Sequence, residues 1–302
     1  MKTAVRIGQL ELKNPVMTAS GTFGYGIEMA EYIDLNRLGA VVVKTITSKP
    51  RAGNPMPRVI ETASGMLNSI GLQNGGIDDF INDKLPFLRQ FETPIVANVA
   101  GENNTDFADL TARVDQADGV AAIELNLSCP NVACGMDYSR SPEAAYEVVS
   151  LCRKQTTKPL FAKLSPNVTD VVPIAKACED AGADALSLIN TLLGMAIDIE
   201  TRRPLLANKM GGLSGPAIKP IAIRIVYQVA QAVEIPIIGI GGIMCAKDAI
   251  EFMIAGATAV QVGTATFVDP TAAIHVIDGI AEYMERHGVE DINTLIGCVH
   301  RA

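Results

Sequence analysis

The chain has 302 residues, of which 48% are apolar and 19% are charged. That composition supplies enough apolar side chains for a large core and excludes a disordered or fibrous chain. Because 33 acidic residues outnumber 25 basic ones, the formal net charge is −8, which disfavours nucleic acid and anionic membranes as partners. No apolar run reaches the ~20 residues of a membrane span, and residues 1–14 lack a signal or transit pattern. We therefore expect a globular, cytoplasmic protein.

Short β-branched apolar runs alternate along the chain with segments of helical periodicity, which is typical of a parallel sheet built from βα units. Several runs are apolar at nearly every position, as strands buried on both faces should be. Eight strands are predicted, over residues 15–19, 40–44, 94–99, 121–127, 159–164, 185–189, 236–240 and 259–262. Six helices are predicted, over residues 104–118, 141–156, 169–181, 219–233, 246–255 and 270–287.

Eight such units in succession favour one (β/α)₈ TIM barrel over a doubly wound sheet, because the chain never divides into two mononucleotide-binding halves. We expect residues 1–302 to form a single domain. Two connections are longer than a barrel loop needs: residues 45–93 after the second strand and residues 191–234 after the sixth. Loops of that length in a compact domain are usually lids or binding insertions.

Barrels of this type carry their chemistry at the carboxyl ends of the strands. The residues at the predicted strand ends are unusually polar: Ser20, Lys44, Thr45, Asn98, Asn126, Cys129, Lys163, Asn190, Gly241, Gly242, Gly263 and Thr264. A single lysine there is most often a surface or paired structural charge. Two lysines and three asparagines at one rim are harder to explain in that way, because each desolvated polar group needs a partner. The rim therefore predicts a polar ligand.

Glycines follow the last two strands, as Gly241 with Gly242 and as Gly263 before Thr264. Many barrels bind a phosphate at this position through backbone N–H groups. Tight βα turns would also explain the glycines, and neither a P-loop nor a dinucleotide-binding fingerprint is present. Position, rather than motif, favours a phosphate site here.

The six cysteines, at positions 129, 134, 152, 178, 245 and 298, form no CxxC pair and are expected to be reduced. The three histidines, at 275, 287 and 300, have no spacing typical of a metal site or a catalytic triad, and we predict no metal.

A free cysteine is usually a small buried hydrophobe. Cys129 differs, because it follows a strand end, precedes Pro130 and lies between two amide side chains. A thiol in this setting can act as a general base if nearby lysines favour its thiolate.

Six blocks of this sequence together resemble the soluble class 1 dihydroorotate dehydrogenases, over essentially the whole chain. The blocks are residues 18–24 (TASGTFG), 44–45 (KT), 53–58 (GNPMPR), 68–74 (NSIGLQN), 126–131 (NLSCPN) and 239–242 (GIGG). The form of residues 53–74 is most similar to class 1B, whose catalytic chain works with a second chain that carries FAD and an iron–sulfur cluster. Residues 132–138 depart from the Gly-Gly-rich loop usual in class 1B, and Cys134 lies within them.

The resemblance implies that FMN lies across the mouth of the barrel and that Cys129 is the catalytic base. FMN contacts would come from Ser20, Lys44, Thr45, Asn98, Asn126, Lys163, Ile189, Gly215, Gly241, Gly242, Gly263 and Thr264. Substrate contacts would come from Lys44, Asn68, Ser69, Ile70, Gly71, Leu72, Asn126, Asn190 and Thr191. The implied reaction is oxidation of (S)-dihydroorotate to orotate in de novo pyrimidine (UMP) biosynthesis, with the C5 proton taken by Cys129 and the C6 hydride accepted by FMN.

The resemblance also implies a homodimer at the core of a heterotetramer, in which electrons pass to NAD through a partner that carries FAD and [2Fe–2S]. This chain has neither an iron–sulfur motif nor an NAD fingerprint of its own. Three alternatives stay open: a class 1A, fumarate-linked enzyme, the related dihydropyrimidine dehydrogenase acting on uracil or thymine, and a flavin-binding barrel without catalysis. Lys44 and the amides of Asn68, Asn126 and Asn190 suit a ring that bears a carboxylate better than a neutral one.

Overall fold

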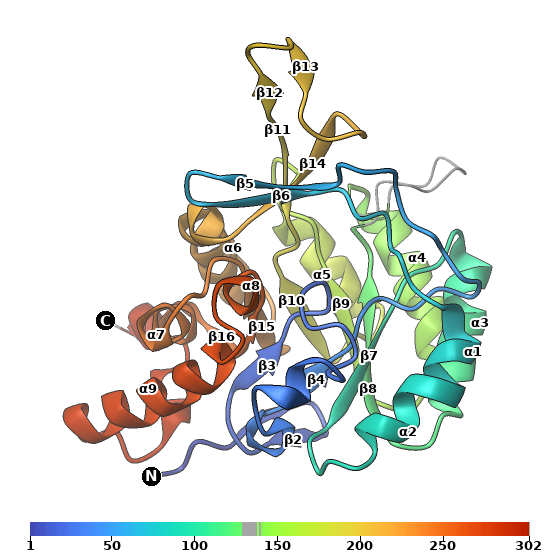
Figure 1. Cartoon of the computed structure of the whole chain (residues 1–302). Coiled ribbons are helices and arrows are strands. Elements are labelled where there is room, and N and C mark those ends of the chain that lie inside the picture. The colour runs from blue at the N-terminus through green and yellow to red at the C-terminus, as the bar shows by residue number, and fades with distance from the viewer. Residues whose placement is uncertain (129–137, 139, 302) are drawn as a thin grey trace.

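The centre of the molecule is a closed barrel of parallel strands. A computed structural model describes residues 1–128, 138 and 140–301. Its main sheet has eight strands in the order β3-β16-β15-β10-β9-β8-β7-β4, and backbone hydrogen bonds from Gly39 to Val16 (2.8 Å) and from Thr18 to Ala40 (3.3 Å) join its two ends (Figure 1). In chain order these strands are β3 (Val16–Thr18), β4 (Val41–Val42), β7 (Ile95–Val99), β8 (Val120–Asn126), β9 (Leu160–Lys163), β10 (Ala185–Leu188), β15 (Ile237–Ile240) and β16 (Ala257–Val262). The predicted TIM barrel is confirmed.

Helices surround the barrel and cover the outer faces of its strands (Figure 1). Those longer than two turns are α3 (Asn104–Asp115), α4 (Pro142–Arg153), α5 (Val172–Asp180), α6 (Lys219–Ala230), α7 (Ala246–Ala255) and α9 (Ala272–His287), with the short α8 (Ala265–Val268) after the last strand. The Ser141 side chain caps α4 by accepting from the backbone of Ala144 at 3.2 Å, and Gly182, with φ +93°, follows the end of α5. Each of the six predicted helices is present, because capping and periodicity are local properties of the sequence.

The connection after β4 contains a helical segment that periodicity did not predict. It runs through α1 (Gly76–Asp79), a π-helical turn η3 (Phe80–Lys84) and α2 (Leu85–Leu88). Pro86 lies inside this segment and removes a backbone donor, so the hydrogen-bonding pattern widens just before it. Short elements were also missed: the hairpin β1 (Val5–Ile7) with β2 (Leu10–Leu12), and the 3₁₀ turns Met29–Glu31, Leu35–Arg37, Pro216–Ile218, Ile292–Leu295 and Cys298–Arg301.

The two long connections meet over one end of the barrel. They form a four-stranded antiparallel sheet in the order β11-β14-β6-β5, built from β5 (Val59–Thr62) and β6 (Gly65–Asn68) of the first connection and β11 (Leu192–Met195) and β14 (Met210–Ser214) of the second. Between β11 and β14, a two-stranded arm of β12 (Ile197–Asp198) and β13 (Arg203–Pro204) projects away from the barrel (Figure 1). The two long connections therefore share one sheet. Within the described part of the chain, no helix is both long and apolar enough to cross a membrane.

Candidate active site

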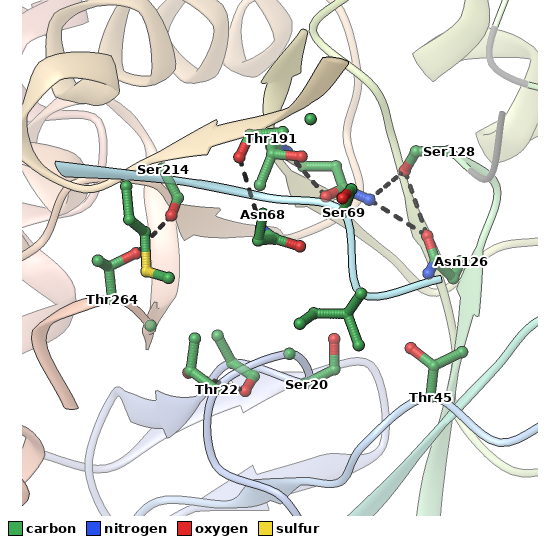
Figure 2. A pocket seen from close by; sticks show the side chains of 18 of the residues that line it. Ser20, Thr22, Thr45, Asn68, Ser69, Asn126, Ser128, Thr191, Ser214 and Thr264 are labelled. Carbon is green, nitrogen blue, oxygen red and sulfur yellow. Dashed lines mark hydrogen bonds between the residues drawn. The ribbon is translucent and has the colours of Figure 1, made fainter. Parts of the chain in front are cut away.

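A cavity of about 560 Å³ lies between the four-stranded sheet and the carboxyl ends of the barrel strands. Figure 2 shows polar side chains facing one another across it. Asn126 and Ser128, at the end of β8, lie on one side, and Ser214 and Thr264 lie on the other, where Thr264 Oγ1 donates to Ser214 Oγ at 2.8 Å. Asn68 of β6 lies between the two groups. The strand ends and both long connections thus share one polar site.

The charge of this cavity opposes the charge of the whole chain. Its described lining includes four cationic residues and no aspartate or glutamate; the cations are Lys44, Arg58, Lys163 and Arg140. The chain as a whole carries a formal charge of −8. A concave site of one sign attracts ligands of the opposite sign. The cavity is therefore suited to an anion.

The two lysines of the cavity differ in their surroundings. Lys163, at the end of β9, is nearly buried, and its Nζ donates to Ser20 Oγ at 3.3 Å and lies 3.8 Å from Glu124 Oε1. Lys44 has no carboxylate within ion-pair distance among the described residues. Burial lowers the pKa of Lys44, and the nearby charges of Lys163 and Arg58 lower it further. An anionic ligand would relieve both effects at Lys44.

An amide cluster on the other side of the cavity is oriented by its own hydrogen bonds. Asn190 Nδ2 donates to Ser128 Oγ at 2.8 Å and to Asn126 Oδ1 at 3.3 Å, while Asn190 Oδ1 accepts from the backbone of Thr191 at 2.7 Å. Asn167, after β9, donates to the Thr191 carbonyl at 3.0 Å. Because Asn126 uses its oxygen inside the cluster, its Nδ2 is left to donate to a ligand.

The glycines after β15 and β16 line the cavity with free backbone donors. Four backbone N–H groups have no acceptor among the described residues, those of Gly241, Gly242, Gly263 and Thr264. Gly242 has φ +78°, and a Cβ there would lie 2.9 Å from both the Gly215 carbonyl oxygen and the Lys219 nitrogen. Only glycine fits this position, and the converging N–H groups form a site of the kind that binds phosphate.

The cavity brings together most of the residues predicted from the sequence. Its lining includes Ser20, Lys44, Thr45, Asn68, Ser69, Ile70, Gly71, Leu72, Asn126, Lys163, Ile189, Asn190, Thr191, Gly215, Gly241, Gly242, Gly263 and Thr264. Asn98 is not among them: it is fully buried inside the barrel, where its Nδ2 donates to Glu124 Oε1 at 2.7 Å. The predicted base Cys129 and the neighbouring Cys134 lie outside the described residues, so their roles stay predictions.

Sequence reasoning overlooked several residues of the site. Arg58 belongs to the GNPMPR block, but no role was assigned to it, because its reach into the cavity depends on how the first long connection folds. Asn167 closely follows a barrel strand, so the strand-end rule could have found it. Glu124 is the one charged residue of β8, and a charge in a largely buried strand needs an explanation.

The barrel and its cavity define a class of protein: a TIM barrel whose cavity, at the carboxyl ends of the strands, is suited to an anionic, polar ligand. Comparison with known proteins is more specific. The family model of dihydroorotate dehydrogenase matches residues 2–284. The chain belongs to the dihydroorotate dehydrogenase family, which confirms the resemblance seen in the sequence.

Similar proteins cover nearly the full chain. It is 59% identical over 297 residues to the protein named "Dihydroorotate dehydrogenase B (NAD(+)), catalytic subunit" of Geotalea uraniireducens, which spans 98% of this chain and 97% of that relative. A protein of the same name from Trichlorobacter lovleyi is also 59% identical, over 98% of both chains. The one from Geobacter sulfurreducens is 57% identical, over 98% of this chain and 97% of the relative.

Proposed function

We propose that this protein oxidises (S)-dihydroorotate to orotate in pyrimidine biosynthesis, as the FMN-containing catalytic subunit of an NAD-linked, class 1B dihydroorotate dehydrogenase. The observation that carries the proposal is the cavity with four cations and no acidic residue in its described lining. Dihydroorotate is a small ring that bears a carboxylate and polar ring groups. The cations suit the carboxylate, and the oriented amides suit the ring. The names of the relatives support the same activity.

The barrel mouth fits FMN in two respects. The unpartnered N–H groups of Gly241, Gly242, Gly263 and Thr264 suit its phosphate, and the Lys163 ammonium at the pocket floor suits a polar ring edge on which negative charge develops. When bound, FMN supplies a two-electron acceptor for the hydride from C6 of the substrate. The whole chain, 1–302, would then be one FMN-binding domain, in the cytoplasm as expected for the soluble class.

A base must remove the proton at C5, and from the resemblance we assign this role to Cys129. Ser128, the residue before Cys129, lines the cavity and is held by Asn190 at 2.8 Å. This hydrogen bond fixes the chain on the N-terminal side of Cys129 at the edge of the cavity. Removal of one proton and one hydride would convert the C5–C6 single bond of the substrate into a double bond.

The test of the activity is the visible spectrum of the purified chain. We expect a flavin spectrum with one FMN per chain, bleached by dihydroorotate under anaerobic conditions and left unchanged by dihydrouracil. Bleaching by dihydrouracil alone would indicate dihydropyrimidine dehydrogenase. A flavin that neither substrate bleaches would indicate a binding protein without catalysis.

Cys129→Ser tests the base. The variant is expected to keep FMN and bind orotate but to reduce its flavin ~10² to 10⁴ times more slowly near neutral pH, because a serine hydroxyl is a far weaker acid than a thiol. Anaerobic stopped-flow mixing with dihydroorotate measures this rate. Cys134→Ser is the matched control and should reduce its flavin at the normal rate. A normal rate in Cys129→Ser would refute the assignment.

The electron acceptor tests the class. With an artificial dye the isolated chain should oxidise dihydroorotate, and it should reduce NAD only after addition of a partner that carries FAD and [2Fe–2S]. The name "catalytic subunit" of the relatives supports such a partner. Rapid turnover with fumarate and no gain from the partner would replace class 1B by class 1A.

We also propose a homodimer at the core of the complete enzyme, as the resemblance implies. The projecting arm and the strands next to it expose several large apolar side chains, namely Leu193, Met195, Ile197, Ile199 and Met210. Exposed apolar groups gathered on one structure are typical of surfaces that bind another chain. Light scattering should give twice the mass of one chain, and Ile199→Glu should shift the equilibrium toward the monomer. A monomeric wild-type chain at micromolar concentration would refute this part.

A further inference from the structure

A carboxylate lies in the interior of the barrel, below the cavity. Glu124 of β8 is fully buried. Three neutral groups from three other strands donate to it: Asn98 Nδ2 to Oε1 at 2.7 Å, Ser187 Oγ to Oε2 at 2.6 Å and Gln261 Nε2 to Oε2 at 2.7 Å. These donors satisfy the oxygens of the carboxylate but supply no positive charge. Burial of a carboxylate without a countercharge lowers the stability of a protein, so a cationic partner is expected nearby.

That partner is Lys163. Its Nζ lies 3.8 Å from Glu124 Oε1, and no other cation of the described residues is within ion-pair distance of this carboxylate. The Lys163 side chain is 7% exposed, and that small exposure is toward the cavity, whose floor it forms. Lys163 also donates to Ser20 Oγ at 3.3 Å. The ammonium is therefore fixed between a buried anion on one side and the cavity on the other.

We infer that Glu124 is a positioning residue that holds the Lys163 ammonium at the floor of the cavity and sets the reduction potential of the bound flavin through it. The inference rests on the proposed placement of FMN over Lys163. A lone ammonium beside the flavin would strongly favour the reduced, more negative form. Glu124 offsets part of that positive charge and so keeps the potential lower.

Lys44 makes this compensation more important. Lys44 is close enough to Lys163 for the positive charge of Lys163 to lower the pKa of Lys44. Two ammonium groups side by side in a poorly solvated site repel each other, and one of them tends to lose its proton. The carboxylate of Glu124 neutralises one of the two charges. It thereby offsets part of the repulsion between Lys163 and Lys44.

Glu124→Gln removes the charge with little change of shape. Asn98 Oδ1 and Gln261 Oε1 are buried and have no partner among the described residues. If the one of these amides that faces the new NH2 group rotates, its oxygen can accept a hydrogen bond from a glutamine at position 124, while the other amide still donates to the glutamine oxygen. The variant should therefore fold and keep FMN.

The first measurement is the midpoint potential of the flavin in the FMN-loaded chain. In Glu124→Gln we expect a more positive potential, with the ratio of reduced to oxidised flavin shifted at least tenfold, or about 30 mV for a two-electron couple. Glu124→Asp keeps the charge and should stay near the wild-type value. Ser187→Ala removes one donor to the same carboxylate without changing the charge, and it should also stay near wild type. An unchanged potential in Glu124→Gln, or an equal shift in Ser187→Ala, would overturn the inference.

The second measurement tests the ion pair without use of the flavin signal. Thermal unfolding is compared for Glu124→Gln, Lys163→Gln and the double variant, because removal of one partner leaves an uncompensated buried charge. The double variant should be more stable than either single variant, even if a single variant fails to fold. A double variant no more stable than the singles would refute the pairing. If the wild-type chain binds no FMN at all, the proposed function fails, while this comparison still decides the pairing.

Discussion

Charged side chains at the two ends of the barrel differ in whether they have partners of opposite charge. At the amino end, Arg153 of α4 pairs with Asp184 at 2.7 Å and donates to the carbonyl of Lys158 at 2.9 Å, while Asp184 also accepts from the backbone of Leu160 at 2.8 Å. At the carboxyl end, Lys44 faces the cavity without a carboxylate partner in the described part of the chain, and its pKa is lowered by burial and by neighbouring cations.

This difference indicates that the charges at the amino end contribute to stability, whereas those at the carboxyl end are available for function. The charges at the amino end are satisfied by the protein itself, so they hold helix and strand together. Among the described residues, Lys44 has no carboxylate partner and the N–H groups of the glycine turns have no acceptor, which costs folding energy and leaves their interactions for a ligand. Substitutions at the two ends should therefore have opposite effects.

The largest effect is expected at Gly242. A side chain in Gly242→Val would meet the Gly215 carbonyl and the Lys219 backbone, and it would occupy the space next to the free N–H groups. We expect the purified variant to contain almost no FMN, as measured by the ratio of absorbance at 450 and 280 nm. Gly288→Ala is the matched control: Gly288 also has a positive φ, but it ends α9 and has open space around it. One FMN per chain in Gly242→Val would show that the phosphate binds elsewhere.

Lys44 and Arg153 form a reciprocal pair of tests. Lys44→Met should weaken orotate binding roughly 10- to 150-fold, the equivalent of one charged hydrogen bond of about 1.5–3 kcal/mol. It should also raise the melting temperature of the orotate-free protein, because a poorly solvated cation is removed. Arg153→Met should do the reverse and lower the free energy of unfolding by about 1–3 kcal/mol with orotate affinity unchanged.

Calorimetric titration with orotate and thermal unfolding of each variant measure these effects. The comparison of the two barrel ends breaks down if Lys44→Met destabilises the protein or if Arg153→Met weakens orotate binding.

The smallest effect is the pH dependence of orotate affinity. The pKa of Lys44 is lowered in the folded protein, so Lys44 loses its proton at a lower pH than the ~10.4 of an ordinary lysine. Since the orotate anion binds the protonated form, affinity should fall as the pH rises through this lowered pKa, by at most tenfold per pH unit. The free energy of unfolding of the orotate-free protein changes in the opposite direction. It increases as the pH rises over the same range, because Lys44 loses an unfavourable charge in the folded protein. Lys44→Met should abolish both trends, and persistence of either one would assign it to another group.

The sequence alone determined the barrel and much of its rim. Buried parallel strands are recognised from short apolar runs, and the polar residues that close them, such as Lys44, Asn126 and Lys163, share one rim because parallel strands end on the same side. Helix caps such as Ser141 were also visible, because they depend on neighbours three residues away. Cys129 was singled out by its place after a strand end and then by the resemblance, and its role stays a prediction.

Only the tertiary structure decided how the site is enclosed and what lies beneath it. The sheet over the mouth pairs β6 with β14, and Asn68 and Gly212, which face each other there, are 144 residues apart. Periodicity reports the face of a strand that is buried, but it cannot report which distant strand pairs with it. The same limit applies inside the barrel, where the partners of Glu124 come from four other strands. Asn98 was assigned to the rim from its place at a strand end, but it donates to the buried carboxylate of Glu124 instead. Side chains alternate in direction along a strand, and only the closed barrel determines which side chains of different strands come into contact.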